Sequence, residues 1–418
     1  WLVYRFARLL LETSGLRDAA PAGSLLATAL YAGYAAPVFY AGFLLMATVS
    51  TTTFLLAAWQ AVRAVERPTR RNWIVLGLLT GLAGLARGNV LLLLFTLPLV
   101  LWHRPETRGR RLRLAALFAA GVLAMVTPVT VRNMIVARDF VLLTSNAGIN
   151  LLIGQQASGG GIFKPVMGAP EAEHDPSMEM SLEWELGRDV KGSEVSRTLA
   201  RRAWETFRDD FASMPAHYAR KVWRFWSGYE LPQIAAYDHW HPRFWSLRVM
   251  PVPYLLFTAV GLAGFLVLPV RARWIIGLLV GTYFLSLLPF FPTSRYRQPI
   301  APLLAVSTAV WLLAVVGSRS RLSGWSGWPR PLARSALLRL LGVTAALVLV
   351  LWPSWTALDP AEVLWQVKMH EASRAGRLGK WRETLVHGAA AEAARPGIAE
   401  TPFRLALYLE DAGALPDA

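Results

Sequence analysis

Long apolar segments separated by short basic segments make up most of the chain. Nine apolar spans contain neither Asp nor Glu, and they cover residues 23–39, 43–64, 73–86, 88–102, 112–130, 250–268, 273–291, 299–317 and 336–352. A helix needs about 20 residues to cross a hydrocarbon core of about 30 Å. Spans 73–86 and 88–102 are shorter, so we expect two short helices that meet at a bend in LARGN (85–89). Residues 1–10 are predicted to end a further helix, and the whole pattern predicts an all-α polytopic membrane protein.

The basic residues between the spans predict which helix ends share a side. Arginine is concentrated in four short segments, which are 63–71, 103–113, 269–273 and 318–339. Counting spans places all four on one side, and Lys and Arg collect on the cytoplasmic side of membranes. The other side is then predicted to hold the LARGN bend, the loop 131–248, the SRYRQ segment (294–298) and the tail 353–418.

Composition supports a membrane protein and excludes several other classes. The 418 residues are 54% hydrophobic and include 18 Trp, which is too apolar for one soluble domain. The net charge of +16 predicts contact with anionic lipid and not with nucleic acid, because the basic residues flank apolar spans. The chain has no Cys, so disulfides and thiolate metal sites are excluded. No cofactor is expected, and a divalent metal is compatible with the sequence but not indicated.

The chain is predicted to contain four regions. They are N-terminal membrane helices (1–130), an extracytoplasmic loop subdomain (131–248), C-terminal membrane helices (249–352) and extracytoplasmic tetratricopeptide-like helices (353–418). Within the loop, residues 142–161 are predicted to be a loop, and 193–226 one or two amphipathic helices broken at Pro215. The segment from Pro215 to Tyr229 mixes aromatic and basic residues in a way that suits the headgroup level of a membrane.

The tail contains a spacing of 34 residues. Gly379 and Gly413 are this far apart, as are Ala372 and Ala406. Tetratricopeptide repeats have this period, and Gly379 and Trp381 lie where these repeats place Gly and an aromatic residue. A generic helical hairpin is the alternative. A repeat tail predicts a protein partner in addition to membrane lipids.

Four arginines are predicted to lie on the side that the basic loops avoid: Arg87, Arg132, Arg295 and Arg297. A cation at the edge of hydrocarbon is costly unless it is paired or wet, and the spans contain no carboxylate. The planar fork of arginine suits bidentate phosphate contact, so the predicted ligand is a lipid phosphate or pyrophosphate. Snorkelling of each arginine to the lipid headgroups is the alternative.

Further polar residues are candidates for the same site. Lys164 follows a Gly-rich segment and is predicted to reach the phosphate from a loop, although an isolated loop lysine is equally ordinary. Asn89, Asn146, Asn150 and Tyr296 are predicted to contact the sugar or the acceptor. Helix capping and turn formation are the alternative for the asparagines.

An ordered set of motifs resembles one known family. The motifs are PVFYAG (37–42), GLLTGLAGLARGNVLLLL (77–94), TPVTVRN (127–133), SNAGINLLIG (145–154), KVWRFWSGYELP (221–232) and SRYRQPIAP (294–302). Together they resemble the GT-C membrane glycosyltransferases of family 39, of the protein-mannosyltransferase and aminoarabinose-transferase type. The resemblance covers roughly residues 1–352, and the tail is similar to that of bacterial members with tetratricopeptide repeats.

The resemblance implies an enzyme that moves a hexosyl or pentosyl group from a polyprenyl-phosphate donor to an extracytoplasmic acceptor, with inversion. It implies a multi-pass protein of the bacterial inner membrane whose active face is extracytoplasmic. Basic residues hold the donor phosphate, and by motif position these are Arg87, Arg132, Arg295 and Arg297. The sugar is left open, and the acceptor is a protein, a lipid A-like glycolipid or a cell-wall polymer.

One part of the family pattern is missing from the chain. The family's general base is an Asp or Glu in the first extracytoplasmic loop, and that loop is expected upstream of Trp1, where the sequence opens inside an apolar stretch. We therefore assign no catalytic residue, interpret the chain as truncated and expect it to be inactive alone. A non-catalytic protein that binds or translocates the lipid carrier is the alternative function. A transporter is disfavoured, because the spans have no carboxylate at the membrane midplane.

Overall fold

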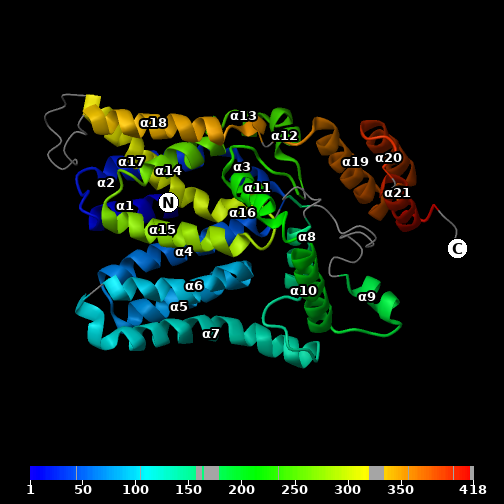
Figure 1. The fold of residues 1–418 in the computed structure, drawn as a ribbon, viewed down its shortest axis with the longest axis horizontal. Helices are drawn as coiled ribbons and strands as arrows, with labels where there is room; N and C mark the ends of the chain where they lie inside the picture. The colour runs from blue at the N-terminus through cyan, green and yellow to red at the C-terminus, as the bar shows by residue number, and fades with distance from the viewer. Residues whose placement is uncertain are drawn as a thin grey trace. The chain divides into compact units, whose positions relative to one another are not determined.

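The computed structural model describes residues 1–43, 45–103, 105–156, 162–163, 178–233, 235–319, 334–355, 357–398 and 400–414. These residues form helices and irregular segments without a strand (Figure 1), which confirms the predicted all-α class. The contacts divide the chain into two units: Trp1–Tyr229 with Val249–Pro353, and Glu230–Arg248 with Ser354–Ala418. The four regions predicted from the sequence describe positions relative to a membrane, and they stay a prediction.

The first unit contains most of the helices. They are α1 (Leu2–Thr13), α2 (Ala20–Ala32), α3 (Ala35–Gly42), α4 (Met46–Glu66), α5 (Arg70–Ala86), α6 (Leu93–Thr96), α7 (Arg111–Val136), α8 (Ala147–Gln155), α9 (Glu179–Leu186), α10 (Gly192–Asp209), α11 (Met214–Trp226), α14 (Gly261–Gly264), α15 (Val270–Leu287), α16 (Ser294–Arg297), α17 (Ala301–Arg319) and α18 (Arg334–Val350). Short 3₁₀ segments flank α6, at Gly88–Leu92 and Leu97–His103. A π-helical turn at Leu256–Val260 precedes α14.

Four helical segments of the described chain are long and apolar enough to cross a membrane. They are Thr107–Val136, Val270–Leu287, Ser294–Val316 and Ser335–Trp355. The apolar helices at Ala20–Ala32 and Gly88–Leu101 are shorter. Ser335–Trp355 buries little of its surface within the protein, so its apolar side chains face the surroundings. Length and composition therefore indicate a membrane protein, with fewer full-length spans than the nine apolar segments suggested.

Two sequence predictions about helices are wrong. The span 23–39 is not one helix, because α2 ends at Ala32 and α3 begins at Ala35. Pro37 lies in the first turn of α3, where the missing N–H of proline costs no hydrogen bond, whereas inside a continuous helix it would cost one. Residues 142–161 are not simply a loop, since α8 forms within them. Ile149, Leu152 and Ile153 of α8 pack against α10, so tertiary burial gives this segment its helical face.

Other predictions are confirmed. Helix α5 ends at Ala86, Arg87 is extended, and a 3₁₀ turn follows, so the LARGN segment is a bend between helices. The amphipathic region divides into α10 and α11, with Pro215 in the first turn of α11. The two helices lie at one end of the long helices of the same unit, and α10 runs across that end (Figure 1).

Hydrogen bonds show which helix ends lie together. At one end, Arg271 at the start of α15 forms an ion pair with Glu66 at the end of α4 and donates to the carbonyl of Thr13, 3.1 Å away. At the other end, Trp223 of α11 donates to the Val350 carbonyl at the end of α18, at 2.7 Å. Segments 63–71 and 269–273 therefore lie at the same end, as predicted, and the ends of α11 and α18 lie together at the other. The orientation in a cell stays a prediction.

The second unit contains α12 (Tyr237–Trp240), α13 (Trp245–Arg248), α19 (Pro360–Arg377), α20 (Trp381–Ala394) and α21 (Glu400–Asp411). Helices α19 and α21 are each followed, two residues after their last residue, by a glycine with positive φ: Gly379 at +69° and Gly413 at +67°. These glycines allow the left-handed conformation that ends both helices. The 34-residue spacing thus marks equivalent helix ends, while assignment to the tetratricopeptide family stays a prediction.

Candidate functional site

Arg87 and Arg295 both contact the ring of Tyr296. Arg87 follows α5, whereas Arg295 and Tyr296 belong to the one-turn helix α16. The guanidinium carbon of Arg87 lies 4.1 Å from the ring centre and that of Arg295 lies 4.9 Å from it. Nη2 of Arg295 also donates a 3.1 Å hydrogen bond to the Tyr296 hydroxyl. We call these three residues the Tyr296 bracket. Two guanidinium groups on one ring are each attracted by its π face, and together they concentrate positive charge.

A cluster of buried polar side chains lies beside the bracket. Nδ2 of Asn89 donates to the hydroxyl of Ser286 on α15, at 2.7 Å, and Tyr283, one turn earlier on α15, lies within electrostatic range of Arg87. Nε of Arg87, Oδ1 of Asn89 and the hydroxyl of Tyr283 are buried and make no hydrogen bond of ordinary geometry among the described residues. Arg87 and Asn89 do lie within weak hydrogen-bonding reach of the Tyr283 hydroxyl, so the three side chains form one incompletely bonded polar cluster. Buried polar groups with incomplete hydrogen bonds are costly, and a polar ligand beside the two cations would complete them.

Arg297 has a different environment from Arg295. Its side chain is fully buried and donates to the backbone carbonyls of Phe225, Ser227 and Tyr229, at 3.3, 2.8 and 2.6 Å. The guanidinium carbon also lies 4.0 Å from the centre of the Tyr254 ring. The carbonyls at the end of α11 carry the negative end of the helix dipole, so they suit a cation. Arg297 therefore connects the SRYRQ segment to α11.

The remaining candidates make local contacts. Arg132 is exposed, and its Nη1 lies 3.5 Å from Oδ1 of Asn133. Asn150 donates to the carbonyl of Asn146, one turn earlier, at 2.8 Å, and Asn146 is the exposed N-cap residue of α8. The side chain of Asn146 makes no capping hydrogen bond, so the proposed contacts of both asparagines stay a prediction. Lys164 lies outside the described residues.

Two titratable residues of α11 were not recognised as buried from the sequence. The ammonium group of Lys221 donates to the Leu288 carbonyl at 3.1 Å and lies 4.6 Å from the ring centre of Tyr218. Burial lowers the pKa of Lys221 to about 7. His217, one turn earlier and fully buried, is hydrogen-bonded through Nε2 to the Gly154 carbonyl at 2.8 Å, and burial lowers its pKa. Their burial could have been predicted from the sequence, because a spacing of four residues on an amphipathic helix places His217 and Lys221 on the same face as Phe225.

The buried carboxylate of Asp139 has a structural role. Its Oδ2 accepts a 2.7 Å hydrogen bond from the backbone N–H of Ser193 in the first turn of α10. Hydrogen bonding from Ser193 holds the pKa of this carboxyl below its usual value. An ionised helix-capping carboxylate of this kind is a poor candidate for a general base.

No protein family model, curated protein or solved structure matches the chain. A functional assignment therefore depends on the chemistry of its own side chains. In the ranges that the structure describes, no cluster of three or more His, Asp or Glu side chains could hold a metal ion. The most distinctive chemistry among these residues is the pair of guanidinium groups on Tyr296, with the buried polar side chains of Asn89 and Tyr283 beside it.

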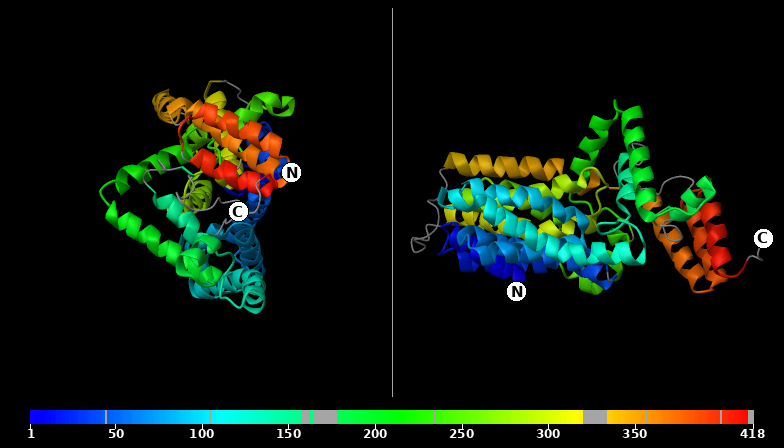
Figure 2. Two further views of the ribbon diagram at one scale, coloured as in Figure 1. Left: turned by 90° about the vertical axis from the view of Figure 1, so that its right-hand side faces the viewer. Right: turned by 90° about the horizontal axis from the view of Figure 1, so that it is seen from below.

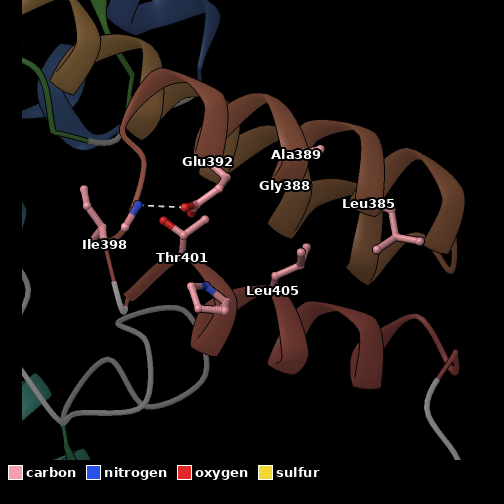
Figure 3. Close-up of a pocket in the computed structure, with 9 residues that line it drawn as sticks. Leu385, Gly388, Ala389, Glu392, Ile398, Thr401 and Leu405 are labelled. Carbon is pink, nitrogen blue, oxygen red and sulfur yellow. Dashed lines mark hydrogen bonds between the residues drawn. The ribbon is translucent and has the colours of Figure 1, made fainter.

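The second unit has a separate apolar groove. It lies between α20 and α21, has a volume of about 520 Å³ and is lined mainly by aliphatic side chains such as Leu385, Ile398 and Leu405 (Figure 3). Glu392 in its wall accepts a hydrogen bond from the backbone N–H of Gly397 at 2.8 Å. The groove has no arrangement of groups for catalysis. The protein partner of the tail stays a prediction.

Proposed function

We propose that this chain is a GT-C-like membrane glycosyltransferase that uses a polyprenyl-phosphate sugar. The Tyr296 bracket carries this proposal, because it pairs two guanidinium groups at the end of apolar helices, where a lipid phosphate would lie. Arg87 follows α5, and Arg295 is the second residue of the candidate span Ser294–Val316. A phosphate oxygen held between two arginines forms charge-assisted hydrogen bonds, which are stronger than those between neutral groups.

The chemistry of transfer explains why cations are needed there. Breaking the bond between sugar and phosphate develops negative charge on the leaving phosphate. Fixed guanidinium groups in a poorly hydrated site stabilise that charge as it appears. The prenyl chain would lie along apolar helix surface, and Asn89 and Tyr296 would contact the sugar beside the phosphate. In this proposal Arg297 positions the SRYRQ segment, while phosphate contact by Arg132 or Lys164 and acceptor contact by Asn146 or Asn150 are further proposals from the family resemblance.

The general base is not assigned to any residue of this chain. The resemblance implies an Asp or Glu from an extracytoplasmic loop, which would remove the proton from the acceptor hydroxyl. The proposed location is a bacterial inner membrane, with the Tyr296 bracket on the extracytoplasmic side. The sugar would be a hexose or a pentose.

A protein that binds or translocates the lipid carrier without transferring sugar is the second candidate. One observation favours it: neither Arg87 nor Asn89 has a carboxylate partner in the part of the chain that the structure describes. Phosphate recognition needs only the cations, whereas transfer also needs a base. The transferase and the carrier-binding protein would therefore share the phosphate site, and only the transferase would consume the lipid-linked sugar.

Binding to the chain in nanodiscs tests the shared part of the proposal. The probes are a fluorescent polyprenyl phosphate and the uncharged polyprenol of the same length. We expect Arg87→Ala and Arg295→Ala each to weaken phosphate binding by about tenfold or more, since a hydrogen bond to a charged group contributes roughly 1.5–3 kcal/mol. Polyprenol binding should not change. Arg110→Ala, in an exposed basic segment, is the matched control.

Equal affinity for the phosphate and the alcohol, or unchanged affinity in both variants, would show that the bracket does not bind phosphate. Turnover distinguishes the two candidates. Consumption of a polyprenyl-phosphate hexose or pentose by the same preparation supports the transferase. Phosphate-dependent binding with no loss of the sugar supports the carrier-binding protein.

A further inference from the structure

Helix α10 and the turn that follows it present an exposed aromatic row that their own fold does not use. The buried face of α10 contains Val195, Leu199 and Ala203, which pack in one core with α8. The row consists of Trp204, Phe207 and Phe211, and we call it the aromatic ladder. Ring centres of successive members lie 5.3 and 5.7 Å apart, so the three rings form one continuous surface. Trp204 is 59% exposed and Phe211 is 64% exposed, so an aqueous setting would leave much apolar area in water.

The position of the ladder relates it to the candidate membrane spans. Helix α11 returns from the ladder to the ends of the long helices: Trp223 donates to the Val350 carbonyl at 2.7 Å, and Lys221 donates to the Leu288 carbonyl at 3.1 Å. Val350 lies in the last turns of the candidate span Ser335–Trp355, and Leu288 follows the candidate span Val270–Leu287. These bonds fix α11 at the level where two apolar spans end.

The hairpin also extends sideways from that level. Seen along the long helices, α10 and α11 meet at a tip that projects beyond the outline of the helices of their own unit (Figure 2). Phe211 lies in the turn between them. A segment that overhangs the side of a membrane bundle at the height of its helix ends meets lipid headgroups, and not bulk water alone.

Charge on α10 matches such a surface. Arg197 and Arg208 lie seven residues before and four residues after Trp204, so they share its face of the helix. Two acidic neighbours are paired, Glu194 with Arg188 and Glu205 with Arg201. Asp209 lies well round the helix from Trp204, and Asp210 accepts a hydrogen bond from the Ser213 hydroxyl in the turn. Aromatic rings and arginines on one face of an amphipathic helix are the combination that binds the interface of anionic membranes.

We propose that the aromatic ladder of α10 inserts into the headgroup region of an anionic bilayer and anchors the α10–α11 hairpin to it. The ladder rings would occupy the boundary between headgroups and acyl chains, and Arg197 and Arg208 would pair with lipid phosphates. This inference requires a membrane-embedded chain but does not depend on the proposed glycosyl transfer. Because the same core of α8 and α10 also packs against Tyr296, an anchored α10 would hold the Tyr296 bracket at a fixed depth.

Site-directed spin labelling of the full chain in vesicles tests this anchor. The chain has no Cys, so single labels can be placed through Trp204→Cys and Phe211→Cys. Asp209→Cys is the matched control, because Asp209 is exposed at the same end of α10 but lies well round the helix from Trp204. In phosphatidylcholine–phosphatidylglycerol vesicles, we expect labels at 204 and 211 to be relaxed strongly by oxygen and weakly by an aqueous nickel chelate. The label at 209 should show the opposite.

Arg208→Cys gives the same readout without removing a ladder ring, so a folding defect in the aromatic variants would not decide the outcome. Strong nickel relaxation at 204, 208 and 211, equal to that at 209, would overturn the anchor. Weak relaxation by both reagents would also overturn it, because the face would then be covered by protein. In vesicles of phosphatidylcholine alone, the oxygen-to-nickel ratio at 208 should fall, and an unchanged ratio would overturn the role assigned to anionic lipid.

Discussion

The guanidinium group of Arg297 lies at the end of α11 and donates a 2.8 Å hydrogen bond to the carbonyl oxygen of Ser227. Ser227 is the C-cap residue of α11, so this bond joins the amphipathic segment to the start of a candidate membrane span. The flanking carbonyls of Phe225 and Tyr229 accept further bonds from the same side chain. Arg297 thereby fixes the backbone that presents Arg295 and Tyr296.

Replacing Arg297 should therefore destabilise the protein before it affects any ligand. In Arg297→Gln, we expect a loss of about 1–3 kcal/mol for each carbonyl left without a donor. The measurement is thermal unfolding in detergent, with Arg295→Gln as the matched variant two residues earlier. Arg295 is only half-buried, so its replacement should change the unfolding temperature much less. Equal stability losses in the two variants would contradict the distinction between them.

The ring of Tyr296 should matter more than its hydroxyl. A cation–π contact contributes about 0.5–2 kcal/mol, depending on how far it is desolvated, and Tyr296 makes two of them. Tyr296→Leu should therefore weaken polyprenyl-phosphate binding by roughly tenfold, because both guanidinium groups lose their support. Tyr296→Phe keeps the ring and loses only the bond from Arg295, so its affinity should stay close to that of the parent chain. Binding assays in nanodiscs compare the three chains, and a Phe variant as weak as the Leu variant would show that the ring is not what holds the cations.

Much of the helical architecture could be predicted from apolar spans, because backbone polar groups within a membrane must be satisfied internally. Spans 112–130 and 299–317 correspond closely to α7 and α17. Helix α8 could not be predicted in the same way, since its short sequence contains two glycines. A Cβ on Gly148 would lie 2.1 Å from the Ser196 carbonyl oxygen, so this glycine serves the close approach of two helices that local sequence does not show.

The candidate site was only partly predictable for a related reason. Arg295 and Arg297 look equivalent in sequence, and both lie in a basic gap between apolar spans. They are two residues apart on the one-turn helix α16, so their side chains leave in nearly opposite directions. One reaches Tyr296 and the other reaches the α11 carbonyls. The sequence predicted that both arginines lie on the extracytoplasmic side, where arginine is uncommon. The geometry of α16 determines which of them can share a ligand with Arg87.

Burial of Lys221 gives a prediction about pH. Its pKa is lowered to about 7, from an ordinary value near 10.5. Between these two pH values the unfolded chain binds a proton at this residue and the folded chain does not, so stability should rise with pH across this window. Below about pH 7 both states hold the proton, so the folded chain bears the whole cost of burying a charged Lys221. The pKa of His217 is also lowered, so stability falls further as the pH drops below the ordinary pKa of histidine.

Unfolding in detergent across this pH range measures the effect. Lys221→Met keeps an apolar stem of similar length and should flatten the profile between about pH 7 and 10.5. Arg220→Met, at an exposed neighbouring position, should leave the profile between about pH 7 and 10.5 unchanged. A Lys221→Met chain with the parent's pH dependence would place the titrating group elsewhere.

The predicted sidedness can be tested in cells because the chain lacks cysteine. Single cysteines at Arg70 and Arg110 lie in exposed basic segments and should be protected from a membrane-impermeant maleimide in intact cells. A cysteine at Asp209, at the end of α10, should react, because the loop that contains it is predicted to be extracytoplasmic. All three should react after the cells are permeabilised. Labelling of the Arg70 or Arg110 variant in intact cells would reverse or refute the topology.

Two glycines of the second unit should respond differently to the same substitution. A Cβ on Gly376 would lie 2.5 Å from the backbone oxygen of Tyr408, whereas a Cβ on Gly388 would lie 2.5 Å from the end of the Leu405 side chain. Backbone cannot move aside as a leucine tip can, so Gly376→Ala should destabilise α19 and α21 by about 1–3 kcal/mol. Gly388→Ala should be close to neutral, because alanine gains roughly 0.5–1 kcal/mol over glycine within a helix. Hydrogen exchange of the α19–α21 amides measures both effects in the full chain, and faster exchange in Gly388→Ala than in Gly376→Ala would contradict the packing of α19 on α21.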